Sequence, residues 1–316
     1  WIVQTGHFEP FHLPDVAIAE ITASWKRRDP AIYGRFDFSW NGLDAPKLLE
    51  YNADTPTSLL EASVVQWFWL QDVMPAADQF NSIHEKLIGT WRDAFAGTLK
   101  QPQVHFSAMA GHEEDTGNTL YMMDVAHQAG LSVSFLPIEA IGFNSRRHCF
   151  VDNADRPITH CFKLYPWEWL WRDDFAPSIA DAGIRFVEPA WKLLLSSKAI
   201  LPLLWQRYPD HPNLLPASFS APQSGRYARK PIYSREGENV QLINETGELR
   251  TDGVYHEEPC IYQALAPLPC FDGRYPVVGG WMVGEEPAGM GIREDASLIT
   301  RNTSRFIPHF ITQETL

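Results

Sequence analysis

The feature that most constrains this chain is a pair of short alternating runs on either side of Asn41-Gly42. The run GRFDF covers residues 34–38, and the run KLLEYN covers residues 47–52. Both have strand-like patterns, and an Asn-Gly pair between two such runs is typical of a β-hairpin turn. The sequence therefore predicts an antiparallel hairpin in the N-terminal part of the chain.

Charged and amide side chains alternate along both predicted strands. Successive side chains of a strand point to opposite faces, so Arg35 shares a face with Asp37, and Glu50 shares a face with Asn52. If the two faces coincide, two carboxylates and an amide oxygen form a hard-cation site suited to Mg²⁺ and substrate phosphates. The arginine would hold a phosphate or carboxylate in a bidentate fork. The alternative is an ordinary amphipathic hairpin with a solvated polar face.

A polar turn over residues 53–57 leads from the hairpin into a predicted helix over residues 58–73. Ser58 and Glu61 have the S-x-x-E spacing of a capping box at the start of this helix. Hydroxyl groups and free amides at a helix N-terminus suit an anionic ligand. The turn therefore strengthens the prediction of a binding site beside the hairpin.

The stretch LLEYNADTPTSLLEASVVQWFWL resembles the synthetase part of the glutathionylspermidine synthase family, in particular its stand-alone members, which lack the amidase domain. The similarity runs from about residue 33 to the end of the chain, with motifs in the order of the family. The further matching segments are SSKAILPLLW (196–205), HPNLLP (211–216), ARKPIYSREGENV (228–240), YQALAPLPCFDGRYPVVGGW (262–281), AGMGIRE (288–294) and LITRNTSRF (298–306).

This resemblance implies a mixed α/β, circularly permuted ATP-grasp-like fold with a central substrate lobe. We expect an N-terminal part with the metal-binding hairpin over residues 1–100, a small α/β substrate lobe over 101–187, and an ATP-grasp nucleotide-binding part over 188–316. The acidic hairpin precedes the nucleotide lysines in the sequence, which is the permuted order of this family. The two ends of the chain must then pack together.

Local patterns predict alternating helices and strands. Strand, helix and strand follow one another over about residues 100–185, which predicts a small parallel sheet, and residues 148–164 resemble a hairpin around Asp152–Pro157. Further helices are predicted over 13–27, 81–96, 119–129 and 190–207. Strands are predicted over 103–110, 131–137, 227–233, 240–244, 260–264 and 277–283, and a polar loop over 111–118.

The chain contains no P-loop and no Rossmann fingerprint, so ATP would have to bind in another way. The resemblance implies that Lys198 and Lys230 contact the phosphates, with Lys192 as a competitor for the first position. It also implies a glycine-bearing turn at Gly237 over the phosphates. A strand that ends in Gln263, Ala264 and Leu265 would pair with the adenine edge through its backbone.

The resemblance also assigns the remaining site residues. Asp37, Glu50 and Asn52 would hold Mg²⁺, and Arg35 would hold the carboxylate or acyl phosphate. Arg293 would neutralise the transferring phosphoryl group, with Arg301 and Arg305 as nearby alternatives. Residues of the substrate site would be Thr55, Thr57, Glu113 and Glu114. Adjacent acidic residues in a loop are otherwise often a solvated charge cluster.

Composition restricts the partners. The 316 residues are 45% hydrophobic with 12 Trp, which favours a packed enzyme, and a net charge of −13 disfavours nucleic acid and anionic membranes. No apolar run approaches the roughly 20 residues that span a bilayer. Four cysteines without C-x-x-C spacing predict reduced thiols and a cytoplasmic location. Because the chain opens on Trp1, we expect an N-terminal piece to be absent.

The function implied is an ATP-dependent carboxylate–amine ligase that forms an amide through an acyl phosphate, with a small-molecule or peptide carboxylate and an amine such as a polyamine as substrates. The alternatives are a nucleotide- or polyamine-binding protein without turnover, and a kinase of a small carboxylate. Asp115-Thr116-Gly117 spells an aspartic-protease triplet without a second copy. The pairs His148-Cys149 and His160-Cys161 match no standard zinc spacing.

Overall fold

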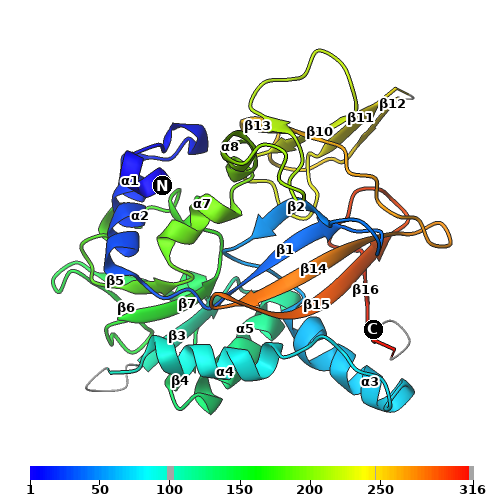
Figure 1. Cartoon of the computed structure of the whole chain (residues 1–316). Helices are drawn as coiled ribbons and strands as arrows, with labels where there is room; N and C mark the ends of the chain where they lie inside the picture. Colours follow the sequence, from blue (N-terminus) through cyan, green and yellow to red (C-terminus); the bar gives the residue numbers. More distant parts are fainter. Residues whose placement is uncertain (98–102, 246, 313–316) are drawn as a thin grey trace.

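The N-terminal hairpin and the C-terminal strands share one antiparallel sheet in the computed structural model, which describes residues 1–97, 103–245 and 247–312 (Figure 1). Strand β1 pairs with β2 on one side and with β14 on the other. In spatial order the strands of this central sheet are β16 (Arg305–Ile307), β15 (Glu286–Asp295), β14 (Tyr275–Val283), β1 (Tyr33–Ser39) and β2 (Lys47–Asn52). The two ends of the chain pack together, as the permuted order predicts.

The predicted hairpin is confirmed in its strands but not in its turn. Residues 40–46 form a wider loop, in which Asn41 Oδ1 accepts hydrogen bonds from the amides of Leu43 and Asp44, both at 2.9 Å. The side chain of Asn41 therefore replaces the backbone contact of a tight turn. The register also shifts between Asp37 and Phe38, which gives the strand an irregularity next to the site.

A parallel sheet forms the small lobe, as the strand–helix–strand order predicts. Its strands lie in the order β4 (Ser132–Phe135), β3 (Gln103–Ala108), β7 (His160–Leu164) and β8 (Arg185–Val187). The predicted hairpin over 148–164 is confirmed only next to its turn, where Val151 and Pro157 form an antiparallel bridge. Beyond the turn, β6 (Cys149–Val151) pairs with β5 (Gly142–Asn144), and β7 joins the parallel sheet. The chain does turn at Asp152, whose amide donates to Arg156 O at 3.0 Å.

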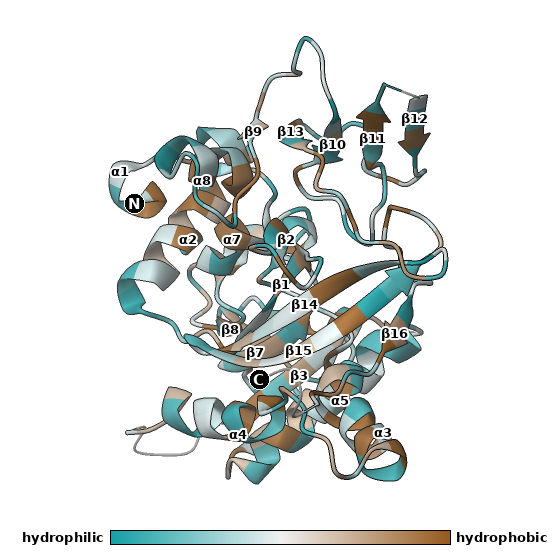
Figure 2. Cartoon of the chain, turned by 45° about the vertical axis from the view of Figure 1, so that its right-hand side comes forward, coloured by the Kyte–Doolittle hydropathy of each residue, from teal (hydrophilic) through white to brown (hydrophobic). Residues whose placement is uncertain are grey.

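A second antiparallel sheet stands above the central sheet in Figures 1 and 2. Its strands lie in the order β12 (Gly247–Arg250), β11 (Gln241–Asn244), β10 (Tyr227–Pro231), β13 (Cys260–Ala264) and β9 (Ala217–Ser218). Figure 2 shows hydrophobic residues on β11 and β12. These strands correspond to the nucleotide-binding half that the resemblance implies.

The helices surround the sheets. They are α1 (Ile2–Thr5), α2 (Asp15–Arg27), α3 (Gln66–Val73), α4 (Ile83–Ala94), α5 (Glu113–Gln128), α6 (Trp167–Leu170), α7 (Leu193–Ser196) and α8 (Ile200–Arg207). The loop predicted over 111–118 is wrong from Glu113 onward. Acidic residues in the first turn of a helix are stabilised by the helix dipole, so Glu113, Glu114 and Asp115 favour an earlier start of α5. The helix predicted over 190–207 is interrupted between α7 and α8.

The capping box predicted for Ser58 and Glu61 is also wrong. Ser58 has a left-handed backbone with φ of 64°, whereas a capping residue has an extended one. The amides of Leu59 and Leu60 instead donate to Asn118 Oδ1 on α5, at 3.0 and 3.2 Å. A π-helical turn, Glu61–Val65, then precedes α3. A residue distant in the sequence therefore caps this helix.

Aromatic packing joins the parallel sheet to the central sheet. Trp91 of α4 packs against Phe106 and Phe162 of the parallel sheet, with ring centroids 5.5 and 6.2 Å apart. Tyr33 stacks on Trp281 within the central sheet. Each ring that folding buries contributes roughly 1.5–3 kcal/mol of hydrophobic free energy. This core fixes the hairpin relative to the small lobe.

The predicted domain boundaries stay predictions, and the first of them, at residue 100, lies outside the described residues. Every helix among the residues that the structure describes is too short or too polar to cross a membrane.

We predict that Asn118→Ala lowers the free energy of unfolding by roughly 1–3 kcal/mol, because two helix amides lose their buried acceptor. Urea denaturation measures this loss. The control is Ser58→Ala, which should change the free energy by less than about 0.5 kcal/mol. A larger loss for Ser58→Ala than for Asn118→Ala would contradict this description of the helix start.

Candidate active site

A cavity of about 330 Å³ lies between the hairpin and the second antiparallel sheet, a size within the range of small-molecule sites. The central sheet, the α7–α8 junction and the turn after β10 all contribute to its wall. The predicted site residues that line it are Arg35, Asp37, Glu50, Asn52, Thr55, Thr57, Lys198, Lys230, Gly237, Gln263, Ala264, Leu265 and Arg293. Of the predicted site residues, Glu113 and Glu114 are not among those that line it.

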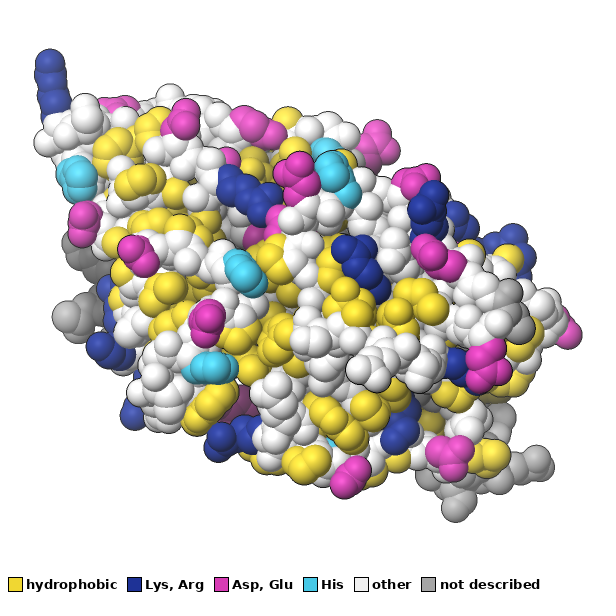
Figure 3. Space-filling model, turned by 90° about the horizontal axis from the view of Figure 1, so that it is seen from above, with side chains coloured by type: hydrophobic (Ala, Val, Ile, Leu, Met, Phe, Trp, Pro, Cys, Tyr) yellow, Lys and Arg dark blue, Asp and Glu magenta, His cyan; other side chains and the backbone are white. Residues whose placement is uncertain are grey.

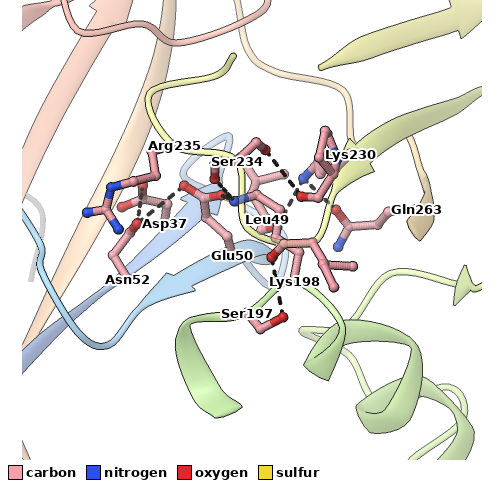
Figure 4. Close-up of polar contacts among 12 residues, drawn as sticks. Asp37, Leu49, Glu50, Asn52, Ser197, Lys198, Lys230, Ser234, Arg235 and Gln263 are labelled. Atoms are coloured by element: carbon pink, nitrogen blue, oxygen red, sulfur yellow. Dashed lines mark hydrogen bonds and ion pairs between the residues drawn. The ribbon is translucent and has the colours of Figure 1, made fainter. Parts of the chain in front are cut away.

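The two predicted faces of the hairpin coincide. Asp37 lies directly opposite Glu50, and Arg35 lies opposite Asn52. Asn52 Nδ2 donates to Asp37 Oδ2 at 3.1 Å and to Glu50 Oε1 at 3.2 Å. The hairpin therefore gathers both carboxylates at one end of the cavity, with the amide nitrogen of Asn52, rather than its oxygen, turned toward them (Figure 4).

Buried cations balance both carboxylates. Asp37 Oδ1 lies 2.7 Å from Arg35 Nε, and its Oδ2 lies 3.0 Å from Arg293 Nη2. Glu50 Oε2 lies 2.9 Å from Lys198 Nζ. Burial alone would raise the pKa of Glu50, but the Lys198 and Lys230 ammonium groups hold that pKa well below its usual range. Glu50 is therefore ionised at neutral pH.

Lys230 lies inside the cavity on β10, as the sequence predicts. Its Nζ donates to Gln263 Oε1 at 2.8 Å and to Leu49 O at 3.0 Å (Figure 4). Burial lowers the pKa of Lys230 to about 8; Glu50 partly offsets this shift, and Lys198 adds to it. This ammonium group is thus poised to lose its proton in mildly alkaline solution.

The two candidate lysines, Lys192 and Lys198, lie in different places. Lys198 follows the end of α7, lines the cavity and also donates to Ser234 O at 2.6 Å. Lys192 instead donates to Tyr33 O at 2.7 Å and pairs with Glu188 at 3.2 Å, and it does not line the cavity. Lys198 is therefore the lysine in position to contact a ligand.

The cations of this site are internal. Lys198, Lys230 and Arg35 are 7%, 9% and 5% exposed. Figure 3 shows one face of the molecule, on which Lys and Arg side chains are interspersed with acidic and hydrophobic side chains. The three cavity cations, by contrast, are almost fully buried.

The turn after β10 packs against the segment before β16. Gly237 has φ of +71°, and a Cβ atom built on it would lie 2.4 Å from the backbone oxygen of Thr300. Thr251 Oγ1 donates to Gly237 O. Only glycine combines this backbone conformation with so close an approach.

The strand predicted to pair with adenine has few free amides. The amide of Ala264 donates to Pro216 O at 2.8 Å, and the amide of Leu265 donates to Arg226 O at 3.2 Å. An adenine edge at this strand would have to use carbonyl groups or the next segment, residues 266–268, which also lines the cavity.

Arg235 is a cavity residue that the sequence reasoning did not single out. Its Nη2 donates to Thr55 O at 3.1 Å and also contacts the Thr55 hydroxyl, while its Nη1 lies 3.5 Å from Glu168 Oε1. The signal available in the sequence was an arginine within the glycine-bearing turn. Thr57 is held in a similar way, because its carbonyl accepts from Arg35 Nη1 at 2.5 Å.

Glu113 and Glu114 stand in the first turn of α5, outside the residues that line the cavity. Burial, and then the nearby Glu61 and Asp115 carboxylates, raise the pKa of Glu114. A cationic ligand at this position would relieve the repulsion among these carboxylates.

The donor set fits Mg²⁺ only in combination with a substrate. Within residues 1–97, 103–245 and 247–312, no group of three or more His, Cys, Asp or Glu side chains is arranged to hold a metal ion. Asp37 and Glu50 supply two carboxylates at facing register positions, and the neighbouring Asn52 turns its amide nitrogen toward both of them. Mg²⁺ characteristically takes one or two carboxylates and completes its shell with phosphates and water. The residues present therefore fit this ion.

The fold defines a general class. The structure resembles that of a glutathione synthetase-like effector, GSS30, from Globodera pallida, with a TM-score of 0.59 over 98% of this chain and 85% of that chain, at 10% identity. The chain thus has a glutathione synthetase-like fold, and the predicted mixed α/β class is confirmed.

The chain belongs to the glutathionylspermidine synthase family, since residues 1–312 match the family model described as "Glutathionylspermidine synthase preATP-grasp". It is 45% identical to the Haemophilus influenzae protein named "Putative acid--amine ligase", over 98% of this chain and 81% of that protein. It is 32% identical to trypanothione synthetase of Crithidia fasciculata over 94% of this chain, and it spans about 50% of that relative's length. The predicted family is confirmed, as is the enzyme class, an ATP-dependent C–N ligase.

We predict that Gly237→Ala lowers the free energy of unfolding by roughly 1–3 kcal/mol, because it adds strain at positive φ and a clash with Thr300. The matched control is Gly42→Ala, at φ of +83° with open space around its Cβ position. Urea denaturation of both variants separates the contact from the backbone strain. Equal losses would show that the Thr300 contact contributes nothing.

Proposed function

We propose that this ligase converts a small-molecule or peptide carboxylate into an acyl phosphate with ATP and then joins it to an amine as an amide. The observation that carries this proposal is the convergence in one cavity of the hairpin carboxylates, two lysines from the nucleotide half and Arg293 from the C-terminal hairpin. Phosphoryl transfer requires such a set of positioned charges and no protein nucleophile.

The two lysines would hold the nucleotide phosphates. Lys198 and Lys230 enter from separate elements and lie within the influence of the same carboxylate, Glu50. When ATP binds, its phosphates would share these ammonium groups with Glu50. Asp37, Glu50 and Asn52 would hold Mg²⁺, which would neutralise charge between the phosphates.

Two guanidinium groups would stabilise the transfer. Arg35 lies two residues before Asp37 on β1, Arg293 lies on β15, and both contact Asp37 and line the cavity. In the first step a carboxylate oxygen of the substrate bonds to the γ-phosphorus and the bond to ADP breaks. In the second, the amine nitrogen bonds to the acyl carbon, phosphate leaves and the nitrogen releases a proton. Both steps develop negative charge on phosphate oxygens, which arginine neutralises.

The amine would approach from the side of α5. Glu113 and Glu114 lie at the start of that helix, and burial, followed by the nearby Glu61 and Asp115 carboxylates, raises the pKa of Glu114. A cationic polyamine would compensate that charge. The names of the relatives support glutathione as a carboxylate donor and spermidine as an amine for a first test. The four cysteines are free thiols, which supports a cytoplasmic location.

The test is Mg²⁺-dependent release of phosphate from ATP with glutathione, spermidine and pools of related carboxylates and amines. We expect release to require both substrates. Glu50→Gln should reduce kcat by about 100-fold or more, because a charge in a pre-organised site is lost. The control is Glu286→Gln, which breaks an exposed pair with Lys86 and should change kcat by less than about twofold.

The outcomes separate the alternatives. Release that requires a carboxylate but not an amine would indicate a kinase. Binding of ATP without release in any pool would indicate a nucleotide- or polyamine-binding protein and would overturn the proposal.

A second prediction concerns pH. The pKa of Lys230 is lowered to about 8, so this group is charged below that pH and neutral above it. With both other substrates saturating, kcat/KM for ATP should fall by up to about tenfold per pH unit above pH 8. Lys230→Arg should remain charged and flatten this decline. A decline of equal steepness in Lys230→Arg would assign the ionisation to another group.

A further inference from the structure

Backbone carbonyl groups of the loop over residues 53–57 accept hydrogen bonds from two arginines of the cavity. Arg35 donates to the carbonyl of Thr57, and Arg235 donates to the carbonyl of Thr55. Arg35 also makes two hydrogen bonds to Asp37, and Arg235 also lies 3.5 Å from Glu168, so the loop is one of the groups that set the direction of each guanidinium group. A shift of the loop would remove one contact from each arginine.

The side chain of Asp54 anchors the same loop to β7 and to the start of α6. Its Oδ1 accepts from Lys163 Nζ at 2.9 Å, and its Oδ2 accepts from the amide of Trp167 at 2.9 Å. The side chains of Asp54 and Lys163 are both 0% exposed. Lys163 also donates to Tyr165 O at 2.8 Å and lies 4.4 Å from the centre of the Trp167 ring.

This buried pair links separate parts of the fold. Asp54 follows β2 of the central sheet, Lys163 belongs to β7 of the parallel sheet, and Trp167 begins α6. Buried ion pairs give little net stability compared with apolar side chains of similar size, but they fix geometry when every donor and acceptor is satisfied. Asp54 does not line the cavity, so it would act through the loop.

We infer that Asp54 is a positioning residue: through Lys163 and Trp167 it fixes the 53–57 loop and so directs Arg35 and Arg235 toward the carboxylate substrate. This inference rests on the proposed function. The contacts proposed for ATP come from other elements, namely Lys198 before α8, Lys230 on β10 and the segment after Gln263. Loss of the anchor should therefore affect the carboxylate much more than ATP.

The test is the charge-neutral double variant Asp54→Asn/Lys163→Met, which removes both charges and keeps an acceptor for the Trp167 amide. With glutathione, spermidine and ATP, we expect KM for glutathione to rise by about tenfold or more, while KM for ATP stays within about threefold. An equal rise in both constants, or no rise, would overturn the inference.

The matched control is Glu188→Gln/Lys192→Met. This pair is also buried, at 3.2 Å, but Glu188 accepts from the amides of Ile32 and Tyr33 rather than holding the 53–57 loop. It should leave the ratio of the two KM values unchanged. A selective rise in KM for glutathione in the control would show that any buried pair has this effect.

Hydrogen exchange without ligands makes the test independent of turnover. The Asp54→Asn/Lys163→Met variant should speed exchange in residues 53–60 while the amides of β1 and β14 keep their protection. The control variant should leave residues 53–60 unchanged. If exchange in residues 53–60 does not change, the anchor is absent and the inference is wrong. A wild-type enzyme without turnover would instead refute the proposed function.

Discussion

The site depends on the antiparallel pairing of β1 with β14. This pairing places Asp37 opposite Gly279. It also brings β1, which carries Asp37, beside the β14–β15 hairpin, which carries Arg293. A Cβ atom on Gly279 would lie 2.8 Å from Arg35 Cδ, so the lack of a side chain at Gly279 leaves room for the side chain of Arg35. Without this register the permuted order of the chain would leave the two halves of the site apart.

Charge compensation is the second constraint. Asp37 and Glu50 each have a cation within 3.0 Å, and two of these cations, Arg35 and Lys198, are almost fully buried. Unpaired charges in such a place would be costly. The same groups would serve the proposed reaction. Mg²⁺ would interact with Asp37 and Glu50, and the phosphates would interact with Lys198 and Arg293. The charged groups of the cavity are thus paired with one another.

Sequence reasoning located what depends on local patterns and on motifs. The hairpin strands and the parallel sheet follow from periodicity, and the resemblance supplied Arg293, which lies 256 positions from the Asp37 carboxylate that it contacts. It could not supply contacts that only the folded chain creates. Asn118, which lies on another helix, caps the helix start in place of the expected Ser58. The side chain of Asn41 accepts a hydrogen bond within a loop that is wider than the expected turn. The local signal for Arg235 was only its place in the glycine-bearing turn, because its contact with Thr55 is made in the folded chain.

The central claim is that the cavity transfers the γ-phosphoryl group to a carboxylate before the amine reacts. The most direct measurement follows the oxygen atoms, with a carboxylate substrate labelled with ¹⁸O and the released phosphate analysed by mass spectrometry. An acyl phosphate requires that one labelled oxygen move from the carboxylate to inorganic phosphate in each turnover. Phosphate without label, while labelled carboxylate is converted into amide, would contradict the account.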